Sequence, residues 1–156
     1  MTLQMEELFA TDYPMNSNGT NIGGWKSSDM RTYMMATMKG YLPDDWESII
    51  KSVNKDSGVG GSSSEVETVS DNCFLLSEVE IFGAVYNSVP GEGTQYAYYK
   101  VGNSTVKNKD GYAGGWWWTR SPYESYPGYF CIENGSGLSD SNSAELAAGV
   151  CFGFCV

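Results

Sequence analysis

Three consecutive tryptophans, Trp116 to Trp118, stand in the segment GGWWWTRSP and constrain the fold more than any other feature of the sequence. Alternate residues of a strand face opposite sides, so Trp116 and Trp118 share one face and Trp117 takes the other. A sheet covered on both faces can bury rings on both sides of one strand. We therefore expect two or more of these rings in the core, with Arg120 satisfied by a nearby carboxylate.

The charge balance excludes several classes of function. The 156 residues carry 19 acidic and 9 basic side chains, a net charge of −10, and no histidine. Such a chain repels phosphate backbones and anionic lipids, so we expect neither nucleic-acid binding nor membrane attachment. The missing histidine removes a Ser-His-Asp or Cys-His catalytic apparatus. The sequence also has no secretory signal pattern and no apolar run of membrane-spanning length.

Four cysteines remain: Cys73, Cys131, Cys151 and Cys155. We interpret them as buried free thiols, since Cys151 and Cys155 would lie about 13 Å apart in an extended strand, beyond disulfide reach. A disulfide through Cys73 or Cys131 is the alternative. A zinc site is disfavoured because there is no CxxC spacing and no histidine. We expect no metal, no cofactor and no catalytic residues.

The order of local patterns predicts an α+β fold in one domain, residues 1–156. Helical spacing indicates a helix in SSDMRTYMMATMKG and a shorter one in PDDWESIIK. We expect residues 1–20 to be poorly defined and the Gly- and Ser-rich stretch 56–70 to be a flexible loop. Strand patterns recur over residues 116–156, in WWWTR, YFCIEN, GLSDSN and GVCFGFCV.

The segment CFLLSEVEIFG is strand-like and would place Glu78 and Glu80 on one face if it is extended. Paired carboxylates can perform acid–base chemistry of the glycosidase kind. Structural carboxylates, either solvated or held by backbone donors, are the favoured interpretation.

Several separated motifs resemble a bacterial and phage domain family without an assigned biochemical function: NIGGWKSSDMRTYM, CFLLSEVEIFG, GGWWWTRSP and the terminal GVCFGFCV. That family resembles a branch of the C-type lectin fold, close to the formylglycine-generating-enzyme type. The same fold carries the variable proteins of diversity-generating retroelements. The resemblance implies two N-terminal helices packed on a small twisted antiparallel sheet with long irregular loops. The usual Arg-Pro of the terminal strand is replaced here by Cys151 and Phe152.

The resemblance implies a display protein whose variable surface lies within residues 116–156. The insert YESYPGYFCIENGSGLSDSNSAELAA mixes tyrosine with small polar residues, as antibody loops do, although solvated turns use the same residues. We expect a protein or glycan on a cell or phage surface to be bound there. That function would place the chain on a phage particle or a bacterial surface, or have it secreted, as part of a larger protein. The sequence itself does not decide between such an exported chain and a cytoplasmic protein. The expected ligand-binding residues are Tyr123, Glu124, Ser125, Tyr126, Tyr129, Glu133, Asn134, Asp140, Asn142, Glu145 and Leu146.

Two other functions stay open at this point. A thiol enzyme like the formylglycine-generating relatives would use Cys151 and Cys155, but both alternate with apolar residues and sit in an acidic chain, which raises thiol pKa values. A purely structural module of a phage tail or surface fibre is the other alternative. Calcium-dependent sugar binding fits poorly because LSDSN is too generic for a calcium cluster.

Overall fold

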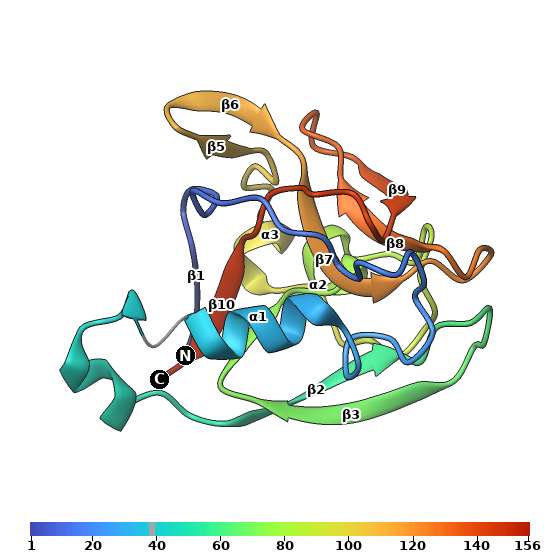
Figure 1. Cartoon of the computed structure of the whole chain (residues 1–156). Coiled ribbons are helices and arrows are strands. Elements are labelled where there is room, and N and C mark those ends of the chain that lie inside the picture. Colours follow the sequence, from blue (N-terminus) through green and yellow to red (C-terminus); the bar gives the residue numbers. More distant parts are fainter. Residues whose placement is uncertain (38–39) are drawn as a thin grey trace.

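The computed structural model describes residues 1–37 and 40–156, and the chain is built mostly from short antiparallel strands (Figure 1). The helices of this part are α1 (Asp29–Thr37), a 3₁₀ helix η2 (Asp44–Ser48), α2 (Glu78–Phe82) and α3 (Ala97–Lys100). The strands are β1 (Thr2–Gln4), β2 (Val53–Gly58), β3 (Val66–Asp71), β4 (Cys73–Leu75), β5 (Lys107–Lys109), β6 (Tyr112–Gly115), β7 (Trp117–Pro122), β8 (Tyr129–Glu133), β9 (Ser139–Ser143) and β10 (Phe152–Cys155).

The expected fold, two N-terminal helices on one small sheet in a C-type lectin-like α+β arrangement, is wrong. Within the described ranges the strands form four small antiparallel sheets, with orders β1-β10-β4, β2-β3, β5-β6 and β7-β8-β9. Helix α1 forms as expected and buries Met30 and Met34. The expected second helix is only the single 3₁₀ segment η2, which buries none of its residues and so gains little from packing.

The stretch expected to be a flexible loop, residues 56–70, is instead most of a hairpin. Strands β2 and β3 pair in register from Val53↔Asp71 to Gly58↔Val66, and the Gly- and Ser-rich residues form only the turn. The pattern is misleading because most inward positions are polar: Lys55, Ser57 and Asp71 are buried beside the single buried valine, Val69. Their partners lie far away in sequence, so alternation of apolar residues could not reveal the strands.

The tryptophan strand forms as expected, and both of its faces are covered. Trp117 and Trp118 are fully buried, and their indole N–H groups donate to the carbonyls of Thr105 and Tyr13 at 3.2 and 3.0 Å. Trp116 precedes the strand and stays 43 % exposed. Two of the three rings are therefore core, as predicted.

Arg120 lies on the same strand and joins four segments in the interior. Its guanidinium is fully buried and forms an ion pair with Glu80 of α2. It also donates to the main-chain carbonyls of Asp56, Leu75 and Glu92 at 2.9–3.1 Å. The expected nearby carboxylate is confirmed, and β7 is fixed against β2, β4 and α2.

The glutamates of CFLLSEVEIFG do not share a strand face. The strand β4 ends at Leu75, and Ser77 begins α2 with a capping box in which its hydroxyl accepts from Glu80 N–H and the Glu80 carboxylate accepts from Ser77 N–H. Glu78 is buried separately and accepts main-chain N–H groups of residues 86–88 at 2.9–3.1 Å. Both are structural carboxylates, as favoured from the sequence.

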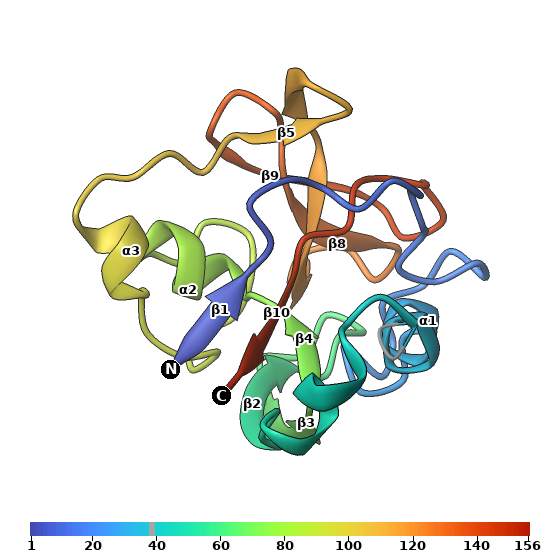
Figure 2. The same ribbon diagram turned by 90° about the vertical axis from the view of Figure 1, so that its left-hand side faces the viewer.

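The N-terminal segment is ordered rather than poorly defined. Strand β1 pairs with β10, and Leu8, Phe9 and Met15 enter the hydrophobic core. The two chain ends lie side by side, with Val156 N–H donating to the Met1 carbonyl at 3.0 Å (Figure 2).

Candidate recognition surface

Two tyrosines of the loop between β7 and β8 and the first residue of β8, also a tyrosine, gather into one aromatic cluster at the surface. The rings of Tyr126 and Tyr129 meet edge to face with centroids 4.9 Å apart, and those of Tyr123 and Tyr129 lie 6.4 Å apart. Tyr126 is 54 % exposed, and the other two are half-buried. We call Tyr123, Tyr126 and Tyr129 the tyrosine patch.

The main chain beneath the tyrosine patch is held by one buried side chain, Asn21. Its amide nitrogen Nδ2 lies 3.0, 3.1 and 2.7 Å from the carbonyl oxygens of Tyr123, Tyr126 and Tyr129. Its Oδ1 accepts the N–H of Gly61 at 2.8 Å, and its own N–H donates to Pro127 at 2.6 Å. A buried amide with all its polar groups paired fixes the loop in one conformation.

The loop containing Asn21 also closes on the tyrosine patch. Thr20 Oγ1 donates to the Pro127 carbonyl at 3.1 Å. Gly128 is confined between this loop and the patch, since a Cβ there would lie 2.9 Å from the Tyr126 ring and 3.2 Å from the Gly19 carbonyl oxygen. A Cβ on Gly19 would in turn lie 3.4 Å from the carboxylate of Glu145. Segments far apart in sequence therefore meet at one surface.

The structure brings together only part of the expected binding set. Glu124 and Ser125 are exposed beside the tyrosines, and Glu145 and Leu146 are exposed in the following turn. The main-chain N–H of Ala144 donates to Gly128, which ties that turn to the tyrosine loop. These four residues and the tyrosine patch form one candidate surface.

Glu133 and Asn134 instead stabilise the turn between β8 and β9. Glu133 is fully buried and accepts the N–H groups of Gly135 and Gly137 at 2.9 and 2.5 Å. Burial raises the pKa of Glu133 more than these hydrogen bonds lower it. Asn134 Oδ1 accepts the N–H of Ser136 at 3.0 Å. The Glu133 carboxylate and the Asn134 side-chain oxygen thus serve this turn, and the structure does not join either residue to the tyrosine patch.

Asp140 and Asn142 lie on β9, away from the centre of the candidate surface. Asn142 is opposite Phe130 and Asp140 opposite Ile132, on the face of the sheet that those core residues occupy, whereas Tyr129 points to the other face. Their carboxylate and amide oxygens accept N–H groups of the next residues at 2.8 Å. The structure does not join them to the tyrosine patch.

Reasoning from the sequence missed Asn21 and Thr20. They stand in the segment TNIGGW, where this polar pair lies just before Gly23 and Gly24, whose φ angles are positive at 85° and 52°. Such glycines indicate a tight turn with close backbone contacts, and that was the available signal. The partners, more than 100 residues later, gave none.

Comparison with protein families identifies the chain. The family described as "Domain of unknown function (DUF6273)" matches residues 1–155. The chain belongs to the DUF6273 family. No curated protein matches it, and no solved structure does.

The cysteines of this DUF6273 chain are all free thiols. Cys73, Cys131 and Cys151 are buried, and Cys155 is half-buried. Burial raises the pKa of Cys151 to about 12 and that of Cys131 well above its ordinary value. Buried protonated thiols lack the accessibility and the thiolate character that a nucleophile needs.

The described residues of this DUF6273 chain offer no group of three or more His, Cys, Asp or Glu side chains arranged to hold a metal ion. None of the helices in the same part of the chain has the length and apolar character needed to cross a membrane.

Proposed function

We propose that this DUF6273 chain is a recognition module whose tyrosine patch binds a protein or glycan on the surface of a bacterial cell or phage. The observation that carries the proposal is the anchoring of all three tyrosine carbonyls by the one buried amide of Asn21. The rings are thereby presented on a fixed main chain while the outermost, Tyr126, stays open to solvent.

Exposed tyrosines on a rigid loop are well suited to recognition. A tyrosine ring supplies a large contact area, loses only two rotatable bonds on binding, and keeps a hydroxyl for hydrogen bonding. Pre-organisation of the loop lowers the entropy cost of association further. The tyrosine patch has the two features that binding surfaces share, an aromatic centre and a polar rim.

Charge narrows the class of target. The exposed carboxylates of Glu124 and Glu145 belong to the candidate surface, and the chain as a whole carries a net charge of −10. A strongly acidic target would be repelled, so we expect a neutral or basic protein surface or an uncharged glycan.

The way the loop is held also suits a site whose side chains vary. Asn21 contacts only main-chain groups of the tyrosine loop, so a change of side chain at Tyr123 or Tyr126 leaves those hydrogen bonds in place. The proposal therefore includes diversification, as in the variable proteins of retroelements. A near-copy of the coding segment for this loop, beside a reverse transcriptase gene, would support that part, and its absence from the neighbouring DNA would oppose it.

A direct screen tests the proposed function. The labelled chain is applied to a printed array of glycans and purified bacterial and phage surface proteins, alongside the Tyr123→Ala/Tyr126→Ala double variant. We expect some spots to bind the wild type and not to bind the double variant. Spots that bind both equally would contradict the proposal.

A further inference from the structure

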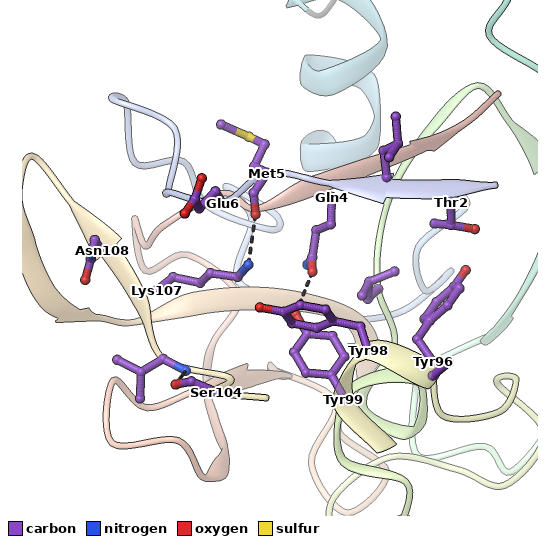
Figure 3. Close-up of a pocket in the computed structure, with 14 residues that line it drawn as sticks. Thr2, Gln4, Met5, Glu6, Tyr96, Tyr98, Tyr99, Ser104, Lys107 and Asn108 are labelled. Atoms are coloured by element: carbon purple, nitrogen blue, oxygen red, sulfur yellow. Dashed lines mark hydrogen bonds between the residues drawn. The ribbon is translucent and has the colours of Figure 1, made fainter. Parts of the chain in front are cut away.

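A concave site lies well away from the tyrosine patch, against the N-terminal strand. A pocket of about 730 Å³ separates β1 from α3 (Figure 3). In Figure 1 this part of the molecule lies on the left, whereas the loop joining β7 to β8 lies on the right. The volume is within the range of sites that bind ligands, roughly 300–1,000 Å³.

One wall of the pocket is formed by an edge strand. Five consecutive residues, Thr2 to Glu6, line it. Strand β1 pairs with β10 on one side, and in the described part of the chain it has no strand on the other. The strand that lines the pocket therefore has an open edge.

The pairing with β10 determines which main-chain groups of β1 are left unpaired. Met1 and Val156 exchange both of their main-chain hydrogen bonds, and Met5 N–H donates to Phe152. In an antiparallel pair every second residue makes these bonds, so the N–H and C=O groups of Thr2 and Gln4 point away from β10. These are unpaired edge groups of the kind that accept an added strand.

The opposite wall is aromatic. Tyr96, Tyr98 and Tyr99 of the α3 region line the pocket, and Figure 3 shows their rings below β1. The Tyr99 hydroxyl donates to Gln4 Oε1 at 2.5 Å, which braces α3 against β1. Tyr98 is 57 % exposed, so its ring can be covered by a ligand.

One hydrogen-bond donor in the lining is under-used. Lys107 Nζ donates to the Met5 carbonyl at 2.8 Å, and no second acceptor of the described chain is within reach although an ammonium has three N–H groups. Spare N–H groups at a pocket wall can donate to the acceptors of a ligand.

We propose that this pocket binds an extended peptide segment, which adds as a strand to the open edge of β1. The main chain of the peptide bonds to the N–H and C=O groups of Thr2 and Gln4. An aromatic or long aliphatic side chain of the peptide lies against Tyr98, and a peptide carbonyl accepts from Lys107.

The edge geometry favours a peptide over a compact organic molecule. Thr2 and Gln4 each present a donor beside an acceptor, and their spacing along the strand is about 7 Å. An extended polypeptide carries donors and acceptors at that same repeat, and strand addition of this kind is a common mode of peptide recognition. A second copy of the chain would offer the same groups, so self-association is an outcome that the test must separate.

Proline at position 4 is the sharpest test. Proline removes the outward N–H of Gln4 and puts ring atoms in its place, which an edge strand tolerates when that N–H does not bond within the sheet. Gln4→Ala is the matched control, because it keeps the main-chain N–H and loses only the side chain that contacts Tyr99. Both variants are compared with the wild type by thermal unfolding to show that they fold.

A displayed library of random heptapeptides is selected on the full chain, and the enriched peptides are synthesised. We expect the Kd of an enriched peptide to rise at least tenfold for Gln4→Pro and less than threefold for Gln4→Ala and Tyr126→Ala. Amide exchange at Thr2 and Gln4 slows when the peptide is bound.

Three results would overturn the proposal. The first is a selection in which no peptide is enriched over the starting library. The second is an enriched peptide that binds Gln4→Pro as tightly as the wild type, or is weakened equally by Gln4→Ala. The third is a wild-type dimer in light scattering that Gln4→Pro dissociates, because the edge would then serve a second copy instead.

Discussion

The side-chain nitrogen Nδ2 of Asn21 lies 2.7 Å from the carbonyl oxygen of Tyr129, across 108 positions of sequence. This contact joins the segment before α1 to the start of β8, and with the bonds to Tyr123 and Tyr126 it defines the tyrosine loop. The display of the tyrosine patch depends on it.

Replacement of Asn21 by alanine removes these three donor contacts and the acceptor for Gly61. We expect Asn21→Ala to lower the free energy of unfolding by about 2–3 kcal/mol, because buried main-chain groups lose their partners. Urea unfolding measures the loss. Asn18→Ala is the control, since Asn18 is exposed and contacts only Thr20 N–H. Equal stability of the two variants would show that Asn21 does not hold the loop.

Arg120→Met leaves Glu80 with only Lys55 as a charged partner. It also removes the guanidinium donor from three main-chain carbonyls. Breaking a buried ion pair from one side costs about 3–5 kcal/mol. Arg120→Lys should recover only part of this, because an ammonium cannot reproduce the planar fork of the guanidinium. The comparison is Lys26→Met, which removes the exposed pair with Glu67 at 2.8 Å and should cost less than about 1 kcal/mol. Similar losses for Arg120→Met and Lys26→Met would refute the structural role of Arg120.

Acid should weaken the fold through Glu78. Burial alone would raise the pKa of Glu78, but hydrogen bonds from Ser139, Ser88 and Asn87 outweigh it and leave the pKa below its ordinary 4.5. A carboxylate with a lowered folded-state pKa stabilises the fold above pH 4.5, and this stabilisation is lost as the pH falls through the folded-state value.

Glu78→Gln tests this origin of the acid sensitivity. We expect the variant to be less stable than the wild type by about 2 kcal/mol at pH 7, with the difference shrinking below pH 4.5. Urea unfolding across this pH range checks it. A difference that stays constant with pH would mean that Glu78 is not charged in the fold. Glu92 has the opposite effect on the pH dependence of stability. Burial raises its pKa, so its ionisation destabilises the fold as the pH rises.

The thiols give a prediction about chemistry. With an aromatic disulfide reagent at pH 8 we expect only Cys155 to react with the native chain, and all four cysteines after unfolding in urea. The half-buried Cys155 is reachable, whereas burial raises the pKa of Cys151 to about 12. Mass spectrometry of the wild type and a Cys155→Ser variant locates the modified thiol. Rapid modification of native Cys151 would support the alternative that the chain is a thiol enzyme.

Local signals predicted the parts of the fold whose causes are local. Helix α1 has its apolar residues at helical spacing, and Trp117 and Trp118 on one strand require cover on both faces. The capping box of Ser77 and Glu80 could also be predicted, because S-x-x-E stands before an apolar pair, although the same segment has a strand-like pattern.

The hairpin of β2 and β3 could not be found in this way, because most of its buried side chains are polar and Val69 is an exception. Lys55 is neutralised by Glu80 at 2.9 Å and Asp71 by Arg31 at 2.7 Å. Burial of these residues depends on partners 25 and 40 positions away. The candidate site was likewise only partly predictable. Composition indicated the tyrosines. It did not indicate that the Glu133 side chain is buried, or that Asp140 lies on the face of the sheet opposite to Tyr129.

The central claim is that the exposed ring of Tyr126 contacts a target. The most direct measurement is the Kd of Tyr126→Ala for a target found on the array, beside Tyr112→Ala, whose ring is 80 % exposed on β6. We predict at least a tenfold weaker Kd for Tyr126→Ala, an unchanged Kd for Tyr112→Ala, and unfolding free energies within about 1 kcal/mol of the wild type for both. Equal affinity of the two variants, or a loss for Tyr126→Ala that only accompanies unfolding, would contradict it.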